Sequence, residues 1–167
     1  MTETWLSGGE IFNLDDGDHL RFELSSPRTG YFYLINEGPQ SSAGLPDYNL
    51  LFPAASVNGG LALVEASHTL QVPEASREGL LLDTQHGTEK VWLLWSAQII
   101  SDIEGFRARL GQGIELRETA DRLALQKLLA SYTLASAAPT TRDAASRVSL
   151  IKGRGPVLAA LLTFEHH

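Results

Sequence analysis

Two stretches decide the fold class of this chain: Gly30-Tyr31-Phe32-Tyr33-Leu34-Ile35-Asn36 and Lys90-Val91-Trp92-Leu93-Leu94-Trp95-Ser96. Each follows a polar turn, and each is rich in the aromatic and aliphatic side chains that are typical of β-strands. A near-continuous apolar run of this length predicts a central strand that is covered on both faces. The two stretches therefore predict an all-β core.

Shorter candidate strands surround these two stretches and are separated by turn residues. Asp15-Asp16-Gly17-Asp18 lies between residues 10–14 and 19–25, and an Asp-Gly pair between apolar runs predicts a hairpin. Within residues 19–25 apolar and polar side chains alternate, so one face of that strand should be buried. Gly, Pro and Ser in residues 37–47 predict a loop. Further strands are expected at residues 48–52, 61–65, 68–72, 79–83 and 89–97.

The pattern changes at Ser101, where Ser101-Asp102-Ile103-Glu104 has the Ser-x-x-Glu spacing of a helix capping box. Gly111-Gln112-Gly113 should end this helix, because Gly is costly inside helices. A second, amphipathic helix is expected from about Glu115 to Leu134. Residues 147–152 and 156–165 alternate again around Gly153-Arg154-Gly155, which predicts a closing hairpin.

Together these elements predict a single domain over residues 1–167. It is expected to be a mainly β protein, an antiparallel β-sandwich of the immunoglobulin-like kind. One or two helices, at about 102–134, are inserted before a C-terminal β-hairpin, and the whole helical insertion spans residues 101–145. The 167 residues, of which 43% are hydrophobic and 20% charged, suffice for a core of ordinary size.

Composition excludes several classes of function. The net charge of −7 and the scattered basic residues disfavour binding to nucleic acid, which depends on clustered Lys and Arg. The chain has no cysteine, which removes thiol nucleophiles, thiolate metal sites and disulfides. No apolar window approaches the length of a membrane span and no signal peptide is evident. We therefore expect a soluble, cytoplasmic protein without a membrane partner.

A family resemblance rests on the motifs Gly30-Tyr31-Phe32-Tyr33-Leu34, Leu51-Phe52-Pro53 and Gly87-Thr88-Glu89, the last of which leads into the second aromatic stretch. In this order they resemble a bacterial family called domain of unknown function 4384, over roughly residues 10–100. The resemblance implies a small β-rich accessory module that is appended to other bacterial domains, such as caspase-like peptidases or kinases. It carries over no catalytic residue, because none is defined for that family.

One candidate for catalysis is the pair formed by His86 and Glu89. An imidazole close to a carboxylate is the smallest unit of acid–base chemistry, so this pair supports an alternative function as a hydrolase or a small-ligand-binding enzyme. The chain lacks a Gly-x-Ser-x-Gly nucleophile motif, and residues 86–89 form the turn into a strand. A structural turn is therefore favoured, with no catalytic residue and no cofactor.

Two groups invite a metal interpretation. Asp15, Asp16 and Asp18 supply carboxylates of the kind that calcium prefers, but their spacing does not match an EF-hand loop, which favours a hairpin turn. His166 and His167 at the C-terminus either bind metal or are the remnant of a purification tag. Neither group is predicted to be a metal site.

Aromatic side chains are candidates for stacking on a sugar or a base. However, residues an odd number apart in a strand point to opposite faces, so Trp92 and Trp95 cannot line one groove, nor can Phe32 and Tyr33. Core packing is therefore the favoured role of these aromatic residues. The full set of candidates is Tyr31, Tyr33, Tyr48, Trp92 and Trp95.

The second helix carries two apolar stripes. Leu116, Ala120, Leu123, Leu128 and Tyr132 define the face that is expected to pack on the sheet. Beside it, Leu125, Leu129 and Tyr132 form a second stripe, which predicts a docking surface for another protein or for a second copy of the chain, that is, a homodimer through the helix. These observations predict a non-catalytic accessory module whose partner is another protein or a neighbouring domain. Loop 37–47 and the helix after Ser101 are the regions where such a function is expected.

Overall fold

The computed structural model describes residues 11–14, 19–40, 44–74, 80–81, 87–111, 113–136, 140–143, 148–151 and 156–166. One large sheet contains β1 (Ile11–Leu14), β4 (Gly30–Gln40), β5 (Pro46–Phe52), β6 (Leu63–Val64), β9 (Gly87–Ser96) and β12 (Val157–His166). Short strand pairs are formed by β2 (His19–Leu20) with β8 (Leu80–Leu81), β3 (Phe22–Leu24) with β7 (Leu70–Val72), and β10 (Thr140–Asp143) with β11 (Val148–Ile151). The helices are α1 (Ser101–Leu110) and α2 (Thr119–Ser136), and a 3₁₀ turn spans Asn58–Gly60.

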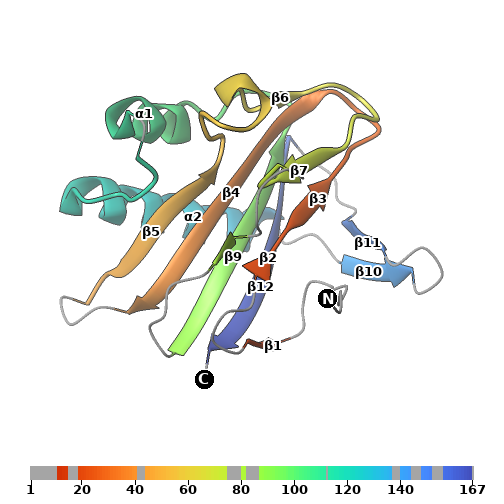
Figure 1. Ribbon diagram of the computed structural model, residues 1–167. Coiled ribbons are helices and arrows are strands. Elements are labelled where there is room, and N and C mark those ends of the chain that lie inside the picture. The colour runs from red at the N-terminus through yellow and green to blue at the C-terminus, as the bar shows by residue number, and fades with distance from the viewer. Residues whose placement is uncertain are drawn as a thin grey trace.

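The large sheet runs in the order β1-β12-β9-β4-β5, and β6 pairs with the first residues of β4 (Figure 1). Its pairings are antiparallel except for the parallel pair of β1 with β12. The two aromatic-rich stretches predicted to be central strands are β4 and β9, which lie side by side, with Tyr31 opposite Ser96 and Glu37 opposite Lys90. The mainly β fold class and the central place of these two stretches are confirmed.

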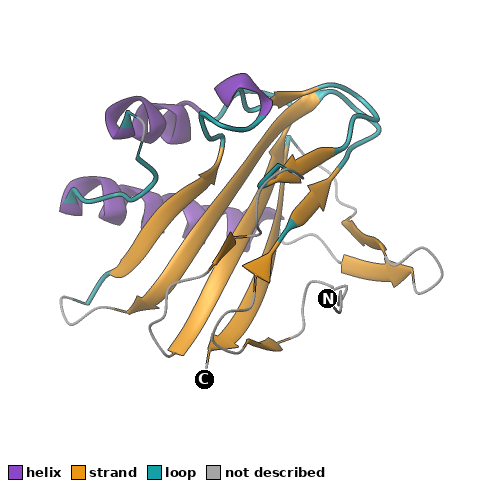
Figure 2. Cartoon of the chain, in the orientation of Figure 1, coloured by secondary structure: helices purple, strands orange, loops and turns teal. Residues whose placement is uncertain are grey.

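The sheet separates two apolar layers. The helices cover one face, and the strand pairs β2–β8 and β3–β7 lie over the other (Figure 2). Tyr33 and Trp92 pack on the helix side, whereas Phe32 and Trp95 pack on the side of the short strands. The predicted division of these aromatic side chains between two faces is therefore confirmed, and core packing is their role.

Local signals account for where many elements begin and end. Strands β5 and β7 stop immediately before Pro53 and Pro73, whose rings cannot donate to a ladder. Helix α1 begins at Ser101 and ends at Leu110, followed by Gly111 with a φ of 62°, a conformation that favours glycine. However, the N-cap is Ile100 and no side chain caps it, so the predicted capping box is not formed. Glu104 is used in another contact instead.

Pairings over long sequence distances differ from those expected. The predicted hairpin of residues 10–14 with 19–25 was wrong: β1 pairs with β12, and β2 pairs with β8. The turn residues 15–18 themselves lie outside the described ranges. Tertiary packing decided the pairing, because β1 completes the large sheet beside the C-terminal end of β12. The alternation in residues 19–24 is nevertheless confirmed, since Leu20 is buried and its neighbours His19 and Arg21 are exposed.

The predicted loop at 37–47 is shorter than expected. Strand β4 continues to Gln40 and β5 starts at Pro46, with an irregular register between Glu37 and Gln40. The side chain of Glu37 is held by Trp92 and Lys90, and this fixes the end of β4 as a strand. Packing on the neighbouring strand has therefore overridden the turn preference of Gly38 and Pro39.

A C-terminal hairpin is present, but it joins β10 with β11. The expected partner strand, β12, instead pairs with β9 along its whole length, from Val157 opposite Ser96 to His166 opposite Gly87. The immunoglobulin-like form of the sandwich is not confirmed. The described residues form one large sheet with helices on one face, and the helices α1 and α2 lie within the predicted 101–145 segment.

Candidate interaction surface

Of the two residues in the predicted catalytic pair, only Glu89 lies within the described residues. His86 lies outside the described residues. Glu89, in β9, is 1% exposed, and its Oε2 accepts a hydrogen bond of 2.9 Å from Nδ2 of Asn36. The Oδ1 atom of Asn36 in turn accepts one of 3.1 Å from Nδ2 of Asn49. This chain of polar groups crosses β9, β4 and β5 and ties the three strands together, as buried polar groups must be paired to be tolerated.

A second polar group lies on the helix side of the same strands. The indole Nε1 of Trp92 donates to Oε2 of Glu37 at 2.8 Å, and Nζ of Lys90 lies 3.7 Å from Oε1 of Glu37. Burial, together with the nearby carboxylate of Glu37, raises the pKa of Tyr48 well above its ordinary value. A tyrosine held neutral in this way packs as an apolar ring, so this cluster also stabilises the sheet.

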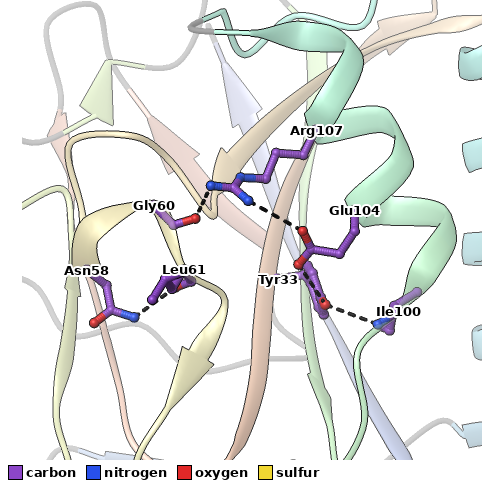
Figure 3. A network of polar contacts seen from close by, with 7 residues as sticks. All are labelled: Tyr33, Asn58, Gly60, Leu61, Ile100, Glu104 and Arg107. Atoms are coloured by element: carbon purple, nitrogen blue, oxygen red, sulfur yellow. Dashed lines mark hydrogen bonds and ion pairs between the residues drawn. The ribbon is translucent and has the colours of Figure 1, made fainter.

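A third polar network fixes α1 to the sheet (Figure 3). The hydroxyl of Tyr33 accepts a hydrogen bond of 3.1 Å from the backbone N–H of Ile100 and donates one of 3.2 Å to Oε1 of Glu104. Arg107 pairs with the other carboxylate oxygen of Glu104 at 3.5 Å and also donates to the carbonyl oxygen of Gly60. Burial, partly offset by the Ile100 N–H and reinforced by the Glu104 carboxylate, raises the pKa of Tyr33 to about 12. We call Tyr33, Glu104 and Arg107 the α1 clamp.

The predicted helix docking residues lie inside the chain. Leu125 and Leu129 are 1% and 2% exposed and pack in the layer between α2 and the sheet, and Tyr132 is half-buried beside them. Leu123, expected to pack on the sheet, is instead 41% exposed. Leu128 and Tyr132 of the other stripe also pack against this layer, and the docking surface expected from Leu125 and Leu129 is a core face in this structure.

The other sequence-based candidates give no site in the described residues. Within these ranges, no group of three His, Cys, Asp or Glu side chains is placed to hold a metal ion. The carboxylates of Asp15, Asp16 and Asp18, and the terminal His167, lie outside them. His166 ends β12, opposite Gly87.

The feature that sets one part of the surface apart is the outer edge of β12. Strand β1 covers this edge only from Thr163 to His166. From Val157 to Leu162, the structure pairs β12 with β9 on its inner side, and no other described strand pairs with its outer side. The segment reads Val-Leu-Ala-Ala-Leu-Leu and contains no charged residue. We call residues 157–162 the open edge.

The pairing geometry shows which backbone groups the open edge presents. The N–H of Ala97 donates to the carbonyl of Pro156 at 2.9 Å, so Ser96 and Val157 form a non-hydrogen-bonded pair of the antiparallel ladder. Residues 158, 160 and 162 therefore bond to β9, and Val157, Ala159 and Leu161 direct their N–H and C=O groups outward. Except for Ala159, which is buried, the six side chains are half-buried.

An edge of this composition is unusual for a protein surface. Natural edge strands are protected by Lys, Pro, a bulge or a covering segment, because unpaired backbone groups between apolar side chains recruit further strands. Single exposed apolar residues elsewhere, such as Leu61 at 61% and Ile99 at 52%, are ordinary surface features. Sequence reasoning assigned 156–165 to a hairpin and missed this edge. The signal that was available was the absence of any charge from residue 157 to residue 162.

Comparison with known proteins adds no relative. No family model matches the chain, and neither the curated proteins nor the solved structures contain a match. The resemblance to the domain of unknown function 4384 family therefore stays a prediction. Among the described helices, none is both long enough and apolar enough to cross a membrane.

Proposed function

We propose that this chain is a non-catalytic accessory module of a bacterial protein, which contacts another protein or a neighbouring domain through the open edge of β12. The observation that carries the proposal is this edge: Val157, Ala159 and Leu161 present backbone donors and acceptors outward from a charge-free strand. Strand addition is a common mode of recognition, in which main-chain hydrogen bonds supply affinity and the alternate side chains supply specificity.

Two further features support an interaction role. Strand β12 is held in place by packing on both of its faces: Ala159 lies in the core layer under α2, and Phe164 is 0% exposed in the layer on the other face. A rigid strand binds with less loss of conformational freedom than a mobile one. The resemblance to a bacterial accessory family points to the same role. The pairing of Glu89 with Asn36 in the sheet interior gives this carboxylate a structural task.

The proposal can be tested with a peptide that can pair as an added strand and has no charged side chain that could bind elsewhere. We suggest a fluorescein-labelled peptide of alternating Thr and Val, with fluorescence anisotropy measured at chain concentrations low enough to keep the protein monomeric. Binding to the wild type is expected and should be lost in Ala159→Pro, because Pro removes an outward N–H and its ring occupies the space of an added strand. Leu123→Lys, on the exposed side of α2, is the control and should bind normally.

Unfolding curves are needed beside the binding data. The N–H of Ala159 does not take part in the ladder with β9, so Ala159→Pro should keep the fold. Peptide binding that is equal in the wild type and in a folded Ala159→Pro variant would show that the open edge is not the contact surface.

A further inference from the structure

The open edge is limited at both ends, and this restricts what can pair with it. At one end β1 begins beside Thr163, and at the other β12 itself begins at Val157. Between them, only Val157, Ala159 and Leu161 direct backbone groups outward. A partner strand must therefore be short, apolar and extended, with its own backbone groups free on one side.

The same segment of a second copy meets these requirements. If two β12 strands run antiparallel with Ala159 opposite Ala159 of the copy, Val157 lies opposite Leu161, and all three outward residues form hydrogen-bonded pairs. A register shifted by two residues toward the C-terminus would require Thr163, whose outer side is already paired with β1. The register centred on Ala159 is thus the one that uses the whole open edge.

The side chains fit this register as well. On the helix side of the sheet, Val157 would face Leu161 of the copy, and the small Ala159 would face itself at the twofold axis, so a large residue meets a medium one and no bulky pair meets at the centre. No charged side chain lies in the ladder, although each chain carries a net charge of −7. An isologous contact needs this self-complementarity, because each surface patch must match itself.

We propose that the occupant of the open edge is a second copy of this chain, and that two β12 strands form a twofold dimer centred on Ala159 with one sheet continuous through both protomers. This inference rests on the proposed function, since it names the partner of the same edge. It replaces the helix as the expected site of a homodimer. About six backbone hydrogen bonds would form across the axis, which is typical of a reversible dimer of modest affinity.

The absence of cysteine from the chain makes the register directly testable. Ala159→Cys would place two thiols on directly opposite residues, whose Cα atoms are about 5.5 Å apart in a hydrogen-bonded pair, within the range of a disulfide. Ala160→Cys is the matched control: residue 160 faces Leu158 of the copy, and its own counterpart is a diagonal neighbour about 7–8 Å away, beyond easy bridging. Under mild oxidation we expect a covalent dimer from Ala159→Cys and much less from Ala160→Cys.

The oligomeric state gives an independent measurement. Analytical ultracentrifugation of the wild type should show a monomer–dimer equilibrium, and Ala159→Pro should weaken it by about thirtyfold or more, because two symmetry-related hydrogen bonds are lost at the axis. Leu123→Lys should dimerise as the wild type does. Added salt should strengthen the dimer, because it screens the repulsion between two chains that are both negative. Ala160→Pro removes a hydrogen bond to β9, so, unlike Ala159→Pro, it should also lower the urea midpoint of unfolding.

The outcomes separate this inference from the function on which it rests. A wild type that stays monomeric at all concentrations, or crosslinking that is stronger in Ala160→Cys than in Ala159→Cys, would overturn the dimer. If the chain is monomeric but the Thr-Val peptide binds the wild type and not Ala159→Pro, the dimer is wrong and the proposed function stands. If neither a copy nor the peptide uses the edge, both are wrong.

Discussion

The large sheet has two edges, and they differ in whether another segment of the chain covers them. At the β5 edge, the segment before α2 lies along the strand: the N–H of Leu50 donates to the carbonyl of Ile114 at 2.8 Å, and the N–H of Leu116 donates to the carbonyl of Tyr48 at 2.9 Å. Leu116 is 3% exposed and anchors this cover in the core. At the β12 edge, residues 157–162 have no described strand on their outer side.

The two edges therefore differ in whether the outward backbone groups of the edge strand have partners within the described residues. A cover such as residues 114–116 satisfies outward backbone groups without adding a strand that others can extend. The cover is part of the connection between α1 and α2, so it adds no separate helix or strand. At the other edge no described strand covers the outer side of residues 157–162, and this is the reason for proposing an interaction function there.

Removing the cover should have the largest effect. Leu116→Ala deletes a side chain that is buried in the core, and we expect the free energy of unfolding to fall by about 2–5 kcal/mol. Hydrogen exchange at the amide of Leu50 should accelerate, because its acceptor on Ile114 is no longer held in place. Urea unfolding and amide exchange measure these changes. Ile114→Ala, at a position 43% exposed, is the control and should cost much less. Equal losses in the two variants would mean that Leu116 does not anchor the cover.

Local sequence was sufficient for features that local chemistry determines. The aromatic stretches at β4 and β9 predicted buried central strands, the alternation in 19–24 predicted a half-buried strand, and Gly111 predicted the end of α1. Each of these features depends on residues that are close in the chain, so the local pattern of residues is enough to predict it.

Features that depend on distant partners could not be predicted in this way. The pairing of β1 with β12 joins the two ends of the chain, and no turn residue records it. On α2, Leu125 and Leu128 lie only about a sixth of a turn apart around the helix axis, so the packing partner determines which residues face the sheet most directly. The open edge was missed for the same reason, since whether β12 is covered depends on where β10 and β11 lie.

The layer between the helices and the sheet should also be sensitive to alkaline pH. Because the pKa of Tyr33 is raised from 10.0 to about 12 in the folded chain, its contribution to stability is complete below pH 10 and is lost as the pH rises toward 12. Burial likewise raises the pKa of Tyr132, on α2. The open edge, residues 157–162, has no titratable side chain. We therefore expect alkaline unfolding to begin in the layer between the helices and the sheet.

Tyr33→Phe tests this expectation and the α1 clamp together. At neutral pH it should cost about 1–3 kcal/mol, because the buried N–H of Ile100 loses its acceptor and Glu104 loses a donor. Above pH 10 the gap to the wild type should narrow, since the variant has no hydroxyl at this position to ionise. Chemical unfolding across this range gives both numbers. Tyr31→Phe, half-buried in the same strand, should change stability by only about 0.5 kcal/mol. A constant gap at all pH values would contradict the role of the Tyr33 hydroxyl.

The smallest effect is expected from the exposed ion pair of Arg122 with Asp47 at the start of β5, where Arg122 also contacts backbone carbonyls. Arg122 of α2 lies 3.2 Å from Oδ1 of Asp47, and it also donates to the carbonyls of Pro46 and Leu45 at 2.9 Å and 2.8 Å. The Asp47 side chain is 47% exposed, whereas that of Arg122 is 13% exposed. Asp47→Asn should therefore change the free energy of unfolding by about 0.5 kcal/mol or less, because exposed ion pairs contribute little. Arg122→Ala should cost about 1.5–3 kcal/mol, since two carbonyls lose a charged donor. If thermal or urea unfolding finds equal losses, the ion pair rather than the backbone contacts fixes the start of β5, and the closed edge then depends on a surface charge that salt can screen.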